Sequence, residues 1–373
     1  MRADLAERLL RQVMGWDTGE FAERVRDLQA LAVVKFDEYG NYGPGSKFVE
    51  NLAMWLDQFP EERRRTAFDF VLTNLVFLSE VEIGHLISLV YPEIIAPVVR
   101  ARVAADEGIQ PHRVAEIERH PHYAELRRRS LVLGASDGAR LDKLRRASPL
   151  SHEQFFQGAR PTIDELEPKV EKLVKALRLP DGETSTFNHI FFVDDFSGSG
   201  RTLIREDSDA PGGYDGKLIR LRDSLAAASG AVQDELAEGD KSRILVEAGT
   251  PVTIVLYCAS EQALAQIRTG IAAAGLGDWK VACVQRLPDS QRVDSAAPDM
   301  AILCHDFFDR STEDSDKGAT PVGYSECALP VVLSHNTPNN SVCLLWMDTS
   351  ERDDGTGLRA LFPRYERHHP DRR

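Results

Sequence analysis

Residues 191–202 read FFVDDFSGSGRT and hold more chemical information than any other stretch of the chain. An apolar run ends in two adjacent carboxylates, and a short glycine-containing turn then leads into Leu203 and Ile204. This order predicts a buried strand, a phosphate-binding loop and the start of a helix. The stretch therefore predicts an α/β fold in which a ligand binds at the carboxyl end of a strand.

The paired acids and the turn together suit a sugar phosphate. Asp194 and Asp195 would lie where their oxygens accept hydrogen bonds from vicinal ribose hydroxyls or hold a metal-bound water. The turn would surround a phosphate with backbone N–H groups, because glycine permits close approach and a positive φ. The phosphate-binding candidates are Gly198, Ser199, Gly200, Arg201 and Thr202.

Two other interpretations of the stretch are possible. A Walker B strand also ends in paired acids, but it requires a G-x-x-x-x-G-K-[ST] loop elsewhere, and residues 43–47 (GPGSK) lack that spacing. The other interpretation is a buried strand followed by a flexible turn, with both acids solvated. We favour the sugar-phosphate hypothesis, because it accounts for both the acids and the turn.

Size and charge limit the classes of function. A chain of 373 residues with 42% hydrophobic content can bury one large core or two medium ones. The formal net charge of -14 argues against a general nucleic-acid-binding surface, which needs clustered lysine and arginine. Residues 63–65 and 127–129 are arginine triplets, but acidic neighbours favour solvated helix faces there.

The cysteines and the chain start favour the cytoplasm. The five cysteines form no C-x-x-C pair and lie mostly in apolar segments, so buried free thiols are expected instead of disulfides or a zinc site. Residues 1–8 mix charges of both signs and predict a helix start, not a signal peptide. The longest apolar runs are too short and interrupted to cross a bilayer. We therefore expect a cytoplasmic protein that makes no membrane contact.

Periodicity predicts two domains. Up to residue 127 apolar side chains recur at helical spacing, as in Phe48, Leu52 and Trp55, whereas strands alternate with helices from Ser130 onward. We predict a helical domain of residues 1–127 and an α/β domain of residues 128–373. Further predicted elements are helices at 80–90, 162–177, 217–236 and 261–274, strands at 131–133, 251–257, 279–284, 301–304 and 342–346, and surface segments at 205–216 and 309–318.

A second strand and loop suit a pyrophosphate group. Residues 131–133 form the strand, and residues 134–138 (GASDG) follow. Basic residues spaced by three, Arg140, Lys143 and Arg146, would lie near one helix face. An ordinary β–α turn with a solvated basic helix remains an equal alternative. The pyrophosphate candidates are Ser136, Asp137, Gly138 and Arg140.

A third candidate segment is rich in asparagine. Residues 331–346 read VVLSHNTPNNSVCLLW, with a polar loop between two apolar runs. Amide and imidazole groups in this loop could contact the edge of an acceptor molecule. Asparagine and proline are also common turn formers, so a loop that only caps itself is the alternative. The acceptor candidates are His335, Asn336, Asn339 and Asn340.

Residues 191–202 resemble the signature of type I phosphoribosyltransferases. In that family the two acids hold the ribose of phosphoribosyl pyrophosphate, the turn holds its 5'-phosphate, and a loop after an early strand holds the pyrophosphate. The resemblance implies these roles for Asp194 and Asp195, for Gly198 to Thr202, and for the loop of residues 136–140. It also implies Mg2+ that bridges pyrophosphate and ribose oxygens. Gly198 departs from the usual hydroxyl residue, which removes one phosphate donor and keeps the backbone cradle.

The chain as a whole resembles a narrower group, the PRTase-CE proteins. A helical N-terminal region, the GASDGA element followed by basic residues, the VDDFSGSG turn and the late HNTPNNS segment carry the likeness. These phosphoribosyltransferase-like proteins are linked to bacterial conflict systems. The resemblance implies a parallel-sheet type I phosphoribosyltransferase-like core behind an all-helical N-terminal domain that could contact partner proteins.

Two functions agree with this resemblance. One is an enzyme of a bacterial defence system that uses phosphoribosyl pyrophosphate and Mg2+ and transfers or cleaves at the ribose anomeric carbon. The other is a sensor without catalysis that binds phosphoribosyl pyrophosphate or a nucleotide and regulates partner proteins. Release of pyrophosphate in the presence of an acceptor would distinguish the first from the second.

Overall fold

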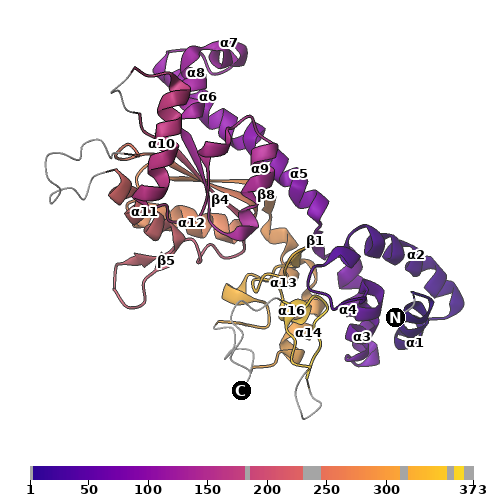
Figure 1. The fold of residues 1–373 in the computed structure, drawn as a ribbon. Coiled ribbons are helices and arrows are strands. Elements are labelled where there is room, and N and C mark those ends of the chain that lie inside the picture. Colours follow the sequence, from indigo (N-terminus) through magenta and orange to yellow (C-terminus); the bar gives the residue numbers. More distant parts are fainter. Residues whose placement is uncertain (1–2, 181–184, 230–244, 311–317, 351–356, 365–373) are drawn as a thin grey trace. The chain divides into compact units, whose positions relative to one another are not determined.

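The computed structural model describes residues 3–180, 185–229, 245–310, 318–350 and 357–364 (Figure 1). The chain forms two compact units, the first from Met1–Ile83 with Pro288–Arg373 and the second from Gly84–Leu287. These units differ from the predicted domains of residues 1–127 and 128–373. Residues 84–127 belong with the sheet, and the last part of the chain belongs with the N-terminal helices. We call the two units the split unit and the α/β unit.

The α/β unit is built on a five-stranded sheet. Its strand order is β3-β2-β4-β7-β8, and every neighbouring pair is parallel. The three central strands are buried along most or all of their length, as expected for a parallel sheet covered on both faces. The predicted parallel α/β core is thereby confirmed. The strands are β2 (Ser130–Gly134), β3 (Phe155–Gln157), β4 (His189–Ser197), β7 (Val252–Ser260) and β8 (Lys280–Leu287).

Helices cover both faces of this sheet. On one face, Leu131, Phe192 and Ile254 share a buried cluster with leucines and isoleucines of three helices. A short helix and the helical run that precedes the sheet lie on the other face (Figure 1). This division follows from right-handed crossovers between parallel strands. The first three helices are α10 (Ile163–Leu177), α11 (Lys217–Ala228) and α12 (Glu261–Ala273), and the short helix is α9 (Leu141–Arg146).

Two of the connections between these elements have regular structure of their own. A capping box at Ser151 opens the single turn His152–Gln154. The predicted surface segment at residues 205–216 is an antiparallel hairpin of β5 (Arg205–Glu206) and β6 (Tyr214–Asp215).

The five cysteines are free, and all but Cys283 are buried, as predicted.

A long helical run precedes the sheet. It consists of α5 (Glu80–Val90), a π-helical turn (Tyr91–Ile95) and α6 (Ala96–Asp106), and α7 (Val114–Arg119) and α8 (Pro121–Arg128) follow. Pro92 has no N–H to donate, and the Ala96 N–H bonds to the Tyr91 carbonyl five residues earlier. The 27 residues Glu80–Asp106 are long and apolar enough to cross a membrane by length and composition, contrary to the expectation that every apolar run is too short. Core helices of soluble proteins meet the same criterion.

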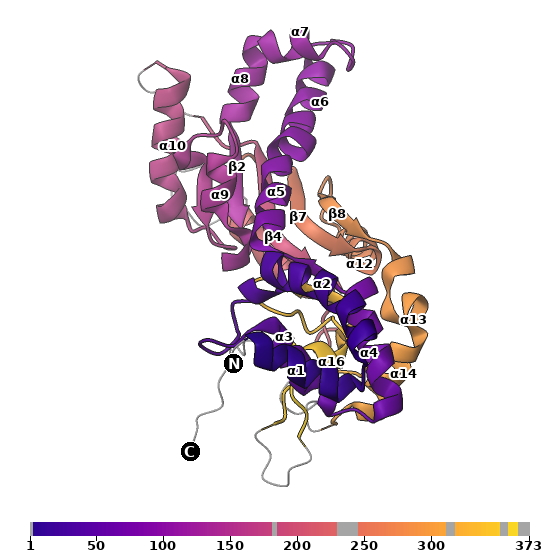
Figure 2. The same cartoon turned by 90° about the vertical axis from the view of Figure 1, so that its right-hand side faces the viewer.

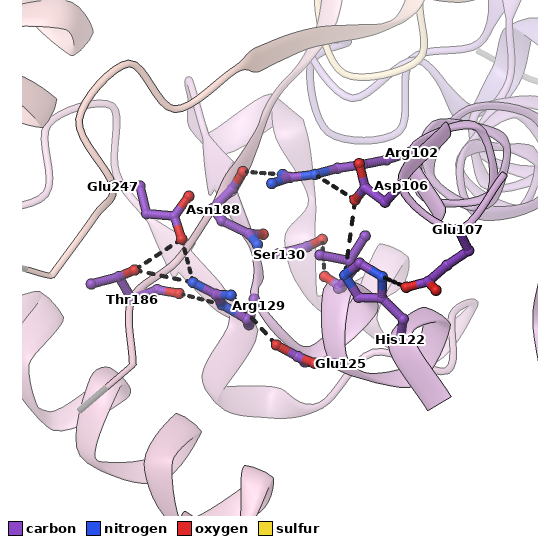
Figure 3. A network of polar contacts seen from close by, with 11 residues as sticks. Arg102, Asp106, Glu107, His122, Glu125, Arg129, Ser130, Thr186, Asn188 and Glu247 are labelled. Atoms are coloured by element: carbon purple, nitrogen blue, oxygen red, sulfur yellow. Dashed lines mark hydrogen bonds and ion pairs between the residues drawn. The ribbon is translucent and has the colours of Figure 1, made fainter. Parts of the chain in front are cut away.

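Polar contacts tie α6 and α8 to the amino ends of β2 and β4 (Figure 3). Arg129 donates to the Thr186 carbonyl at 3.0 Å and pairs with Glu247. Arg102 donates to the Asn188 carbonyl at 2.9 Å. These arginines satisfy carbonyl groups where the strands begin, at the edge of the sheet opposite to the ends that a ligand would use.

His189, the first residue of β4, is expected to make the protein less stable in mild acid. Burial, helped by the charges of Arg102 and Lys280, lowers the His189 pKa to about 4, so the ring is neutral in the fold and its Nε2 lies 3.0 Å from the Thr253 hydroxyl. A lowered histidine pKa gives stability that is complete above the unfolded pKa and is lost as the pH falls towards the folded one. Lowering the pH from about 7.5 to about 5 should remove about 2 kcal/mol of unfolding free energy through this ring.

Urea denaturation at both pH values measures this effect. His189→Gln should abolish its share of the pH dependence, and His152→Gln, at an exposed position, should not. Equal pH dependence in the two variants would contradict the assignment.

The split unit begins with helices that pack together (Figure 2). They are α1 (Ala3–Met14), α2 (Thr18–Val34), α3 (Phe48–Asp57) and α4 (Glu61–Thr73). The strand β1 (Val76–Leu78) follows and pairs in parallel with β9 (Val331–Leu333). The N-terminal region is therefore not all helical, because it contains a strand whose partner comes from the end of the chain.

The end of the chain completes the core of the split unit. The Trp55 indole N–H donates to the Leu344 carbonyl at 2.9 Å, and the ring of Phe362 stacks on that of Phe48 at 5.7 Å. Residues 301–304 and 342–346 were wrongly predicted as strands, because short apolar runs do not distinguish strand from buried helix. They belong to α14 (Pro298–Phe307) and α16 (Cys343–Trp346), which follow α13 (Val293–Ala296).

Candidate functional site

The candidate site lies where the strand order reverses. The chain runs from β2 outward to β3 and then returns to β4 on the other side of β2. The carboxyl ends of β2 and β4 are therefore adjacent at a switch point, where ligands bind in open α/β sheets. The loops that leave these two ends, residues 135–140 and 198–202, are the predicted pyrophosphate and phosphate segments.

The structure brings these two segments into contact. The Ser136 hydroxyl donates to Asp194 Oδ1 at 2.5 Å. A Cβ added to Gly138 would lie 2.4 Å from Asp195 Oδ2, so only glycine leaves room for that carboxylate. Candidates separated in sequence by more than fifty residues thus meet at one end of the sheet.

The two acids point to opposite faces of the sheet. Side chains alternate along a strand, which places Asp194 on the side of α11 with Phe192 and Asp195 on the side of α9 with Val193. Asp194 is buried, and its Oδ2 lies 2.8 Å from the Lys217 ammonium. Asp195 is half-buried, and its Oδ1 accepts a hydrogen bond from the Phe196 N–H at 2.9 Å. The acids therefore have different surroundings.

Burial raises the pKa of Asp194. The charge of Asp195 raises this pKa further, whereas Lys217 and the Ser136 hydroxyl act against the shift. A raised carboxyl pKa gives stability that is complete in acid and is lost as the pH rises through the folded pKa. The ionised form of Asp194 therefore lowers the stability of the fold at neutral pH. Carboxyl groups with raised pKa values are common at functional sites.

Lys217 was not predicted as a site residue. It opens α11 directly after the β5–β6 hairpin, and its N–H donates to the Thr202 carbonyl at 3.2 Å. Gly216, with φ of 129°, precedes it, and a Cβ there would lie 2.4 Å from the Leu203 carbonyl oxygen. The end of the hairpin therefore packs tightly against the residue that follows the turn. Lys217 comes next in the chain and places its ammonium beside Asp194.

The turn of residues 198–202 has the properties of an anion cradle. Gly198, Ser199 and Gly200 are buried, whereas Arg201 and Thr202 are exposed. Within the described part of the chain, no group accepts a hydrogen bond from the N–H groups of Ser199, Gly200 or Thr202. Neighbouring N–H groups in such a turn suit a phosphate.

Helix α12 holds this turn in place. The Ser260 hydroxyl donates to the Gly198 carbonyl and accepts the Ala263 N–H as the N-cap of α12. Gly200 has φ of 75°, and a Cβ there would lie 2.8 Å from the Ala263 carbonyl oxygen. The positive φ of Gly200 agrees with the prediction. The group that leaves no room for a side chain there is the backbone of α12, whereas the sequence had suggested a bound phosphate in that position.

A tyrosine of β7 contacts the loop after β2. Residues Asp137–Ala139 form a single 3-10 turn, and the Tyr257 hydroxyl donates to the Ala139 carbonyl. Burial and the charges of Asp195 and Asp194 raise the pKa of Tyr257. Arg140 adopts a left-handed conformation with φ of 43° and precedes α9, so it does not lie on the predicted helix face. Tyr257 was also missed, since an apolar strand gives no sign of which aromatic side chain reaches a loop.

The asparagine-rich loop belongs to the split unit. The Asn41 amide donates to the His335 carbonyl at 3.2 Å, and Asn336 Oδ1 accepts the Thr337 N–H at 3.0 Å. The Asn340 amide donates to the Tyr324 carbonyl at 3.2 Å. These contacts favour the alternative in which the loop stabilises itself, and an acceptor role for His335, Asn336, Asn339 and Asn340 stays a prediction.

The oxygens of the site suit Mg2+ only in part. Mg2+ in nucleotide sites is held by one or two carboxylates, water and the phosphates of the ligand. Half-buried Asp195 fits such a ligand by its exposure, whereas Asp194 is buried and its two oxygens contact Ser136 and Lys217. Among the described residues, no group of three or more His, Cys, Asp or Glu side chains could hold a metal ion. A metal ion at this site would be coordinated mainly by the phosphate oxygens of the bound ligand.

Comparison with known proteins gives one match. A family model described as PRTase-CE matches residues 52–364, which is most of the chain. Neither the curated proteins nor the solved structures gave a match.

Proposed function

The chain belongs to the PRTase-CE family, and from this premise we propose that the loops after β2 and β4 bind phosphoribosyl pyrophosphate or a nucleotide that carries the same sugar phosphate. The observation that carries this proposal is the buried turn at the switch point, with backbone N–H groups that lack acceptors among the described residues. The paired acids beside it supply acceptors for ribose hydroxyls.

Each segment has a distinct task in this proposal. The turn of residues 198–202 holds the 5'-phosphate, and Asp195 accepts hydrogen bonds from the ribose. In this proposal Ser136, Asp137, Gly138 and Arg140 meet the pyrophosphate, which is supported by the closeness of Gly138 to Asp195 and of Ser136 to Asp194. When bound, Mg2+ would neutralise the pyrophosphate and polarise its departure, with Asp195 as the carboxylate that contacts it.

The reaction that fits this site is substitution at the anomeric carbon. An acceptor attacks as pyrophosphate leaves, through a transition state with oxocarbenium character. The residues named above position the ligand and hold charge near the bond that breaks, and they form no covalent intermediate. We propose that this chemistry serves a bacterial defence system in the cytoplasm.

A sensor is the second candidate function. Three valines of the split unit are exposed, namely Val33 at 77%, Val34 at 71% and Val81 at 79%. Val33 and Val34 are adjacent in α2, and such neighbouring exposed apolar side chains would suit contact with a partner protein. In the sensor hypothesis, binding of a ligand to the α/β unit changes the activity of a partner protein bound to the split unit, and the ligand is not converted.

Calorimetry with phosphoribosyl pyrophosphate, followed by a pyrophosphate-release assay with candidate acceptors, tests both functions. We expect saturable binding, because the turn follows the acids directly and the loop after β2 meets both acids at the same end of the sheet. Pyrophosphate release supports the enzyme, and binding without release supports the sensor. If phosphoribosyl pyrophosphate, ribose 5-phosphate and nucleotides all fail to bind, both functions are contradicted.

A further inference from the structure

We propose that the outer edge of β8 is an interface at which a second copy of this chain binds. β8 of one copy pairs antiparallel with β8 of the other, and the two five-stranded sheets become one continuous sheet. Ala282 lies at the two-fold axis of this pairing, opposite Ala282 of the second copy. This interface is independent of the proposed ligand.

The backbone of β8 is open on its outer side. β8 ends the strand order and has β7 as its neighbour (Figure 2). In the described part of the chain, no backbone group outside β7 bonds to the backbone of Lys280–Leu287. The carbonyls of Gln285 and Arg286 accept hydrogen bonds from side chains of the same strand. Such a row of backbone groups is a template for pairing with another chain.

The middle of β8 lacks the features that keep an edge strand from pairing, which are short length, bulges, proline and charge. The strand has eight residues and no proline, whereas β3 at the other edge has three residues. Its pairing with β7 keeps one offset from Lys280 to Leu287, so no bulge turns it away. Val281–Val284 are uncharged and half-buried. An added strand would cover them further.

Charge complementarity favours a second copy and selects the register. With Ala282 at the axis, Arg286 of each copy lies opposite Asp278 of the other. An axis at Cys283 would instead set Lys280 opposite Arg286. Opposite charges across two strands stabilise the pair, and like charges destabilise it. Asp278 and Arg286 are exposed and form no ion pair among the described residues, so both are available for this contact.

Symmetry limits the assembly to two copies. An axis at Ala282 keeps the pairing within residues 278–286, inside the α/β unit. Both copies use the same surface, so the contact is closed and stops at a dimer. Two paired strands bury less surface than an obligate interface does, and we expect a dissociation constant of about 10 µM.

Sedimentation equilibrium of the full chain at about 1–100 µM tests this interface. Arg286→Glu sets like charges opposite each other twice and should weaken the dimer at least about tenfold. Asp278→Lys combined with Arg286→Glu exchanges the two charges and should restore the dimer. Arg119→Glu makes the same change of charge at an exposed position of α7 and is the matched control.

Disulfide cross-linking tests the register. In a chain that also carries Cys283→Ser, Ala282→Cys places two thiols at the axis. The Cα atoms of directly opposed residues lie about 5 Å apart, which is close enough for a disulfide. Oxidation with diamide should link the two copies. Ala115→Cys, at an exposed position of α7, should not link them.

A chain that stays monomeric at about 100 µM overturns the proposal and leaves the edge of β8 for an extended segment of another protein. A dimer that Arg286→Glu weakens no more than Arg119→Glu does also overturns it, as does failure of the charge exchange to restore the dimer. If Ala282→Cys links the copies no better than Ala115→Cys, the contact lies elsewhere and the proposal is wrong.

Discussion

Asp194→Asn combined with Asp195→Asn should weaken the binding of phosphoribosyl pyrophosphate at least about 100-fold, because Asp195 loses its charge as an acceptor for ribose and metal, and Asp194 loses the charge that holds Lys217 at the site. The fold should not be weakened. The raised pKa of Asp194 shows that its ionised form is unfavourable where it is buried, so an uncharged amide of the same shape removes that cost. Lys217, 20% exposed, can turn its ammonium towards water when the carboxylate is gone.

Calorimetry and thermal unfolding of the same samples measure the two effects. Glu61→Gln with Glu62→Gln removes the same two charges from exposed positions of α4 and controls for the change in net charge. A double variant at 194 and 195 that binds as tightly as this control would rule out the acids as ligand residues. A melting temperature well below that of the control would show that the acids hold the fold together instead.

Gly200→Val should lower the free energy of unfolding by about 3 kcal/mol, since a β-branched residue is strained at positive φ and its side chain would overlap α12. The Cβ alone would lie 2.8 Å from the Ala263 carbonyl oxygen and 3.1 Å from Gln266 Cβ. Because backbone cannot retreat as a side chain can, α12 and the turn must separate. Loss of ligand binding in this variant would follow from the displaced turn.

Gly212→Val separates strain from overlap. Gly212 has nearly the same backbone angle, with φ of 79°, but nothing lies within 4 Å of its added Cβ. This variant should lose only the strain contribution of about 1–2 kcal/mol. Urea denaturation of both variants measures the difference, and equal stabilities would mean that α12 does not confine Gly200.

The site residues that are neighbours in the chain could be predicted from the sequence. The acids and the turn of residues 194–202 follow one another directly, and the strand and the turn follow from local patterns of polarity and glycine. The β2 loop was predicted for the same reason. Its contact with Asp194 and Asp195 needed the strand order, which places β2 beside β4.

Lys217 and the split unit could not be predicted in this way. The approach of Lys217 to Asp194 depends on how the β5–β6 hairpin closes, and a polar segment of that length permits many paths for the chain. The pairing of β1 with β9 joins Val76 to Val331, and no local pattern links the two. Periodicity shows which side chains need burial but does not show which distant segment buries them.

The split unit also sets the order in which the protein can be completed on the ribosome. The α/β unit is one continuous stretch, so it can reach its packing while later residues are still being added, as domains generally do during synthesis. Helices α1 to α4 leave the ribosome earlier, yet Phe48 and Trp55 pack against Phe362 and Leu344. These helices therefore keep part of their apolar surface uncovered until the segment with Leu344 and Phe362 has been made, although they come before the α/β unit in the chain.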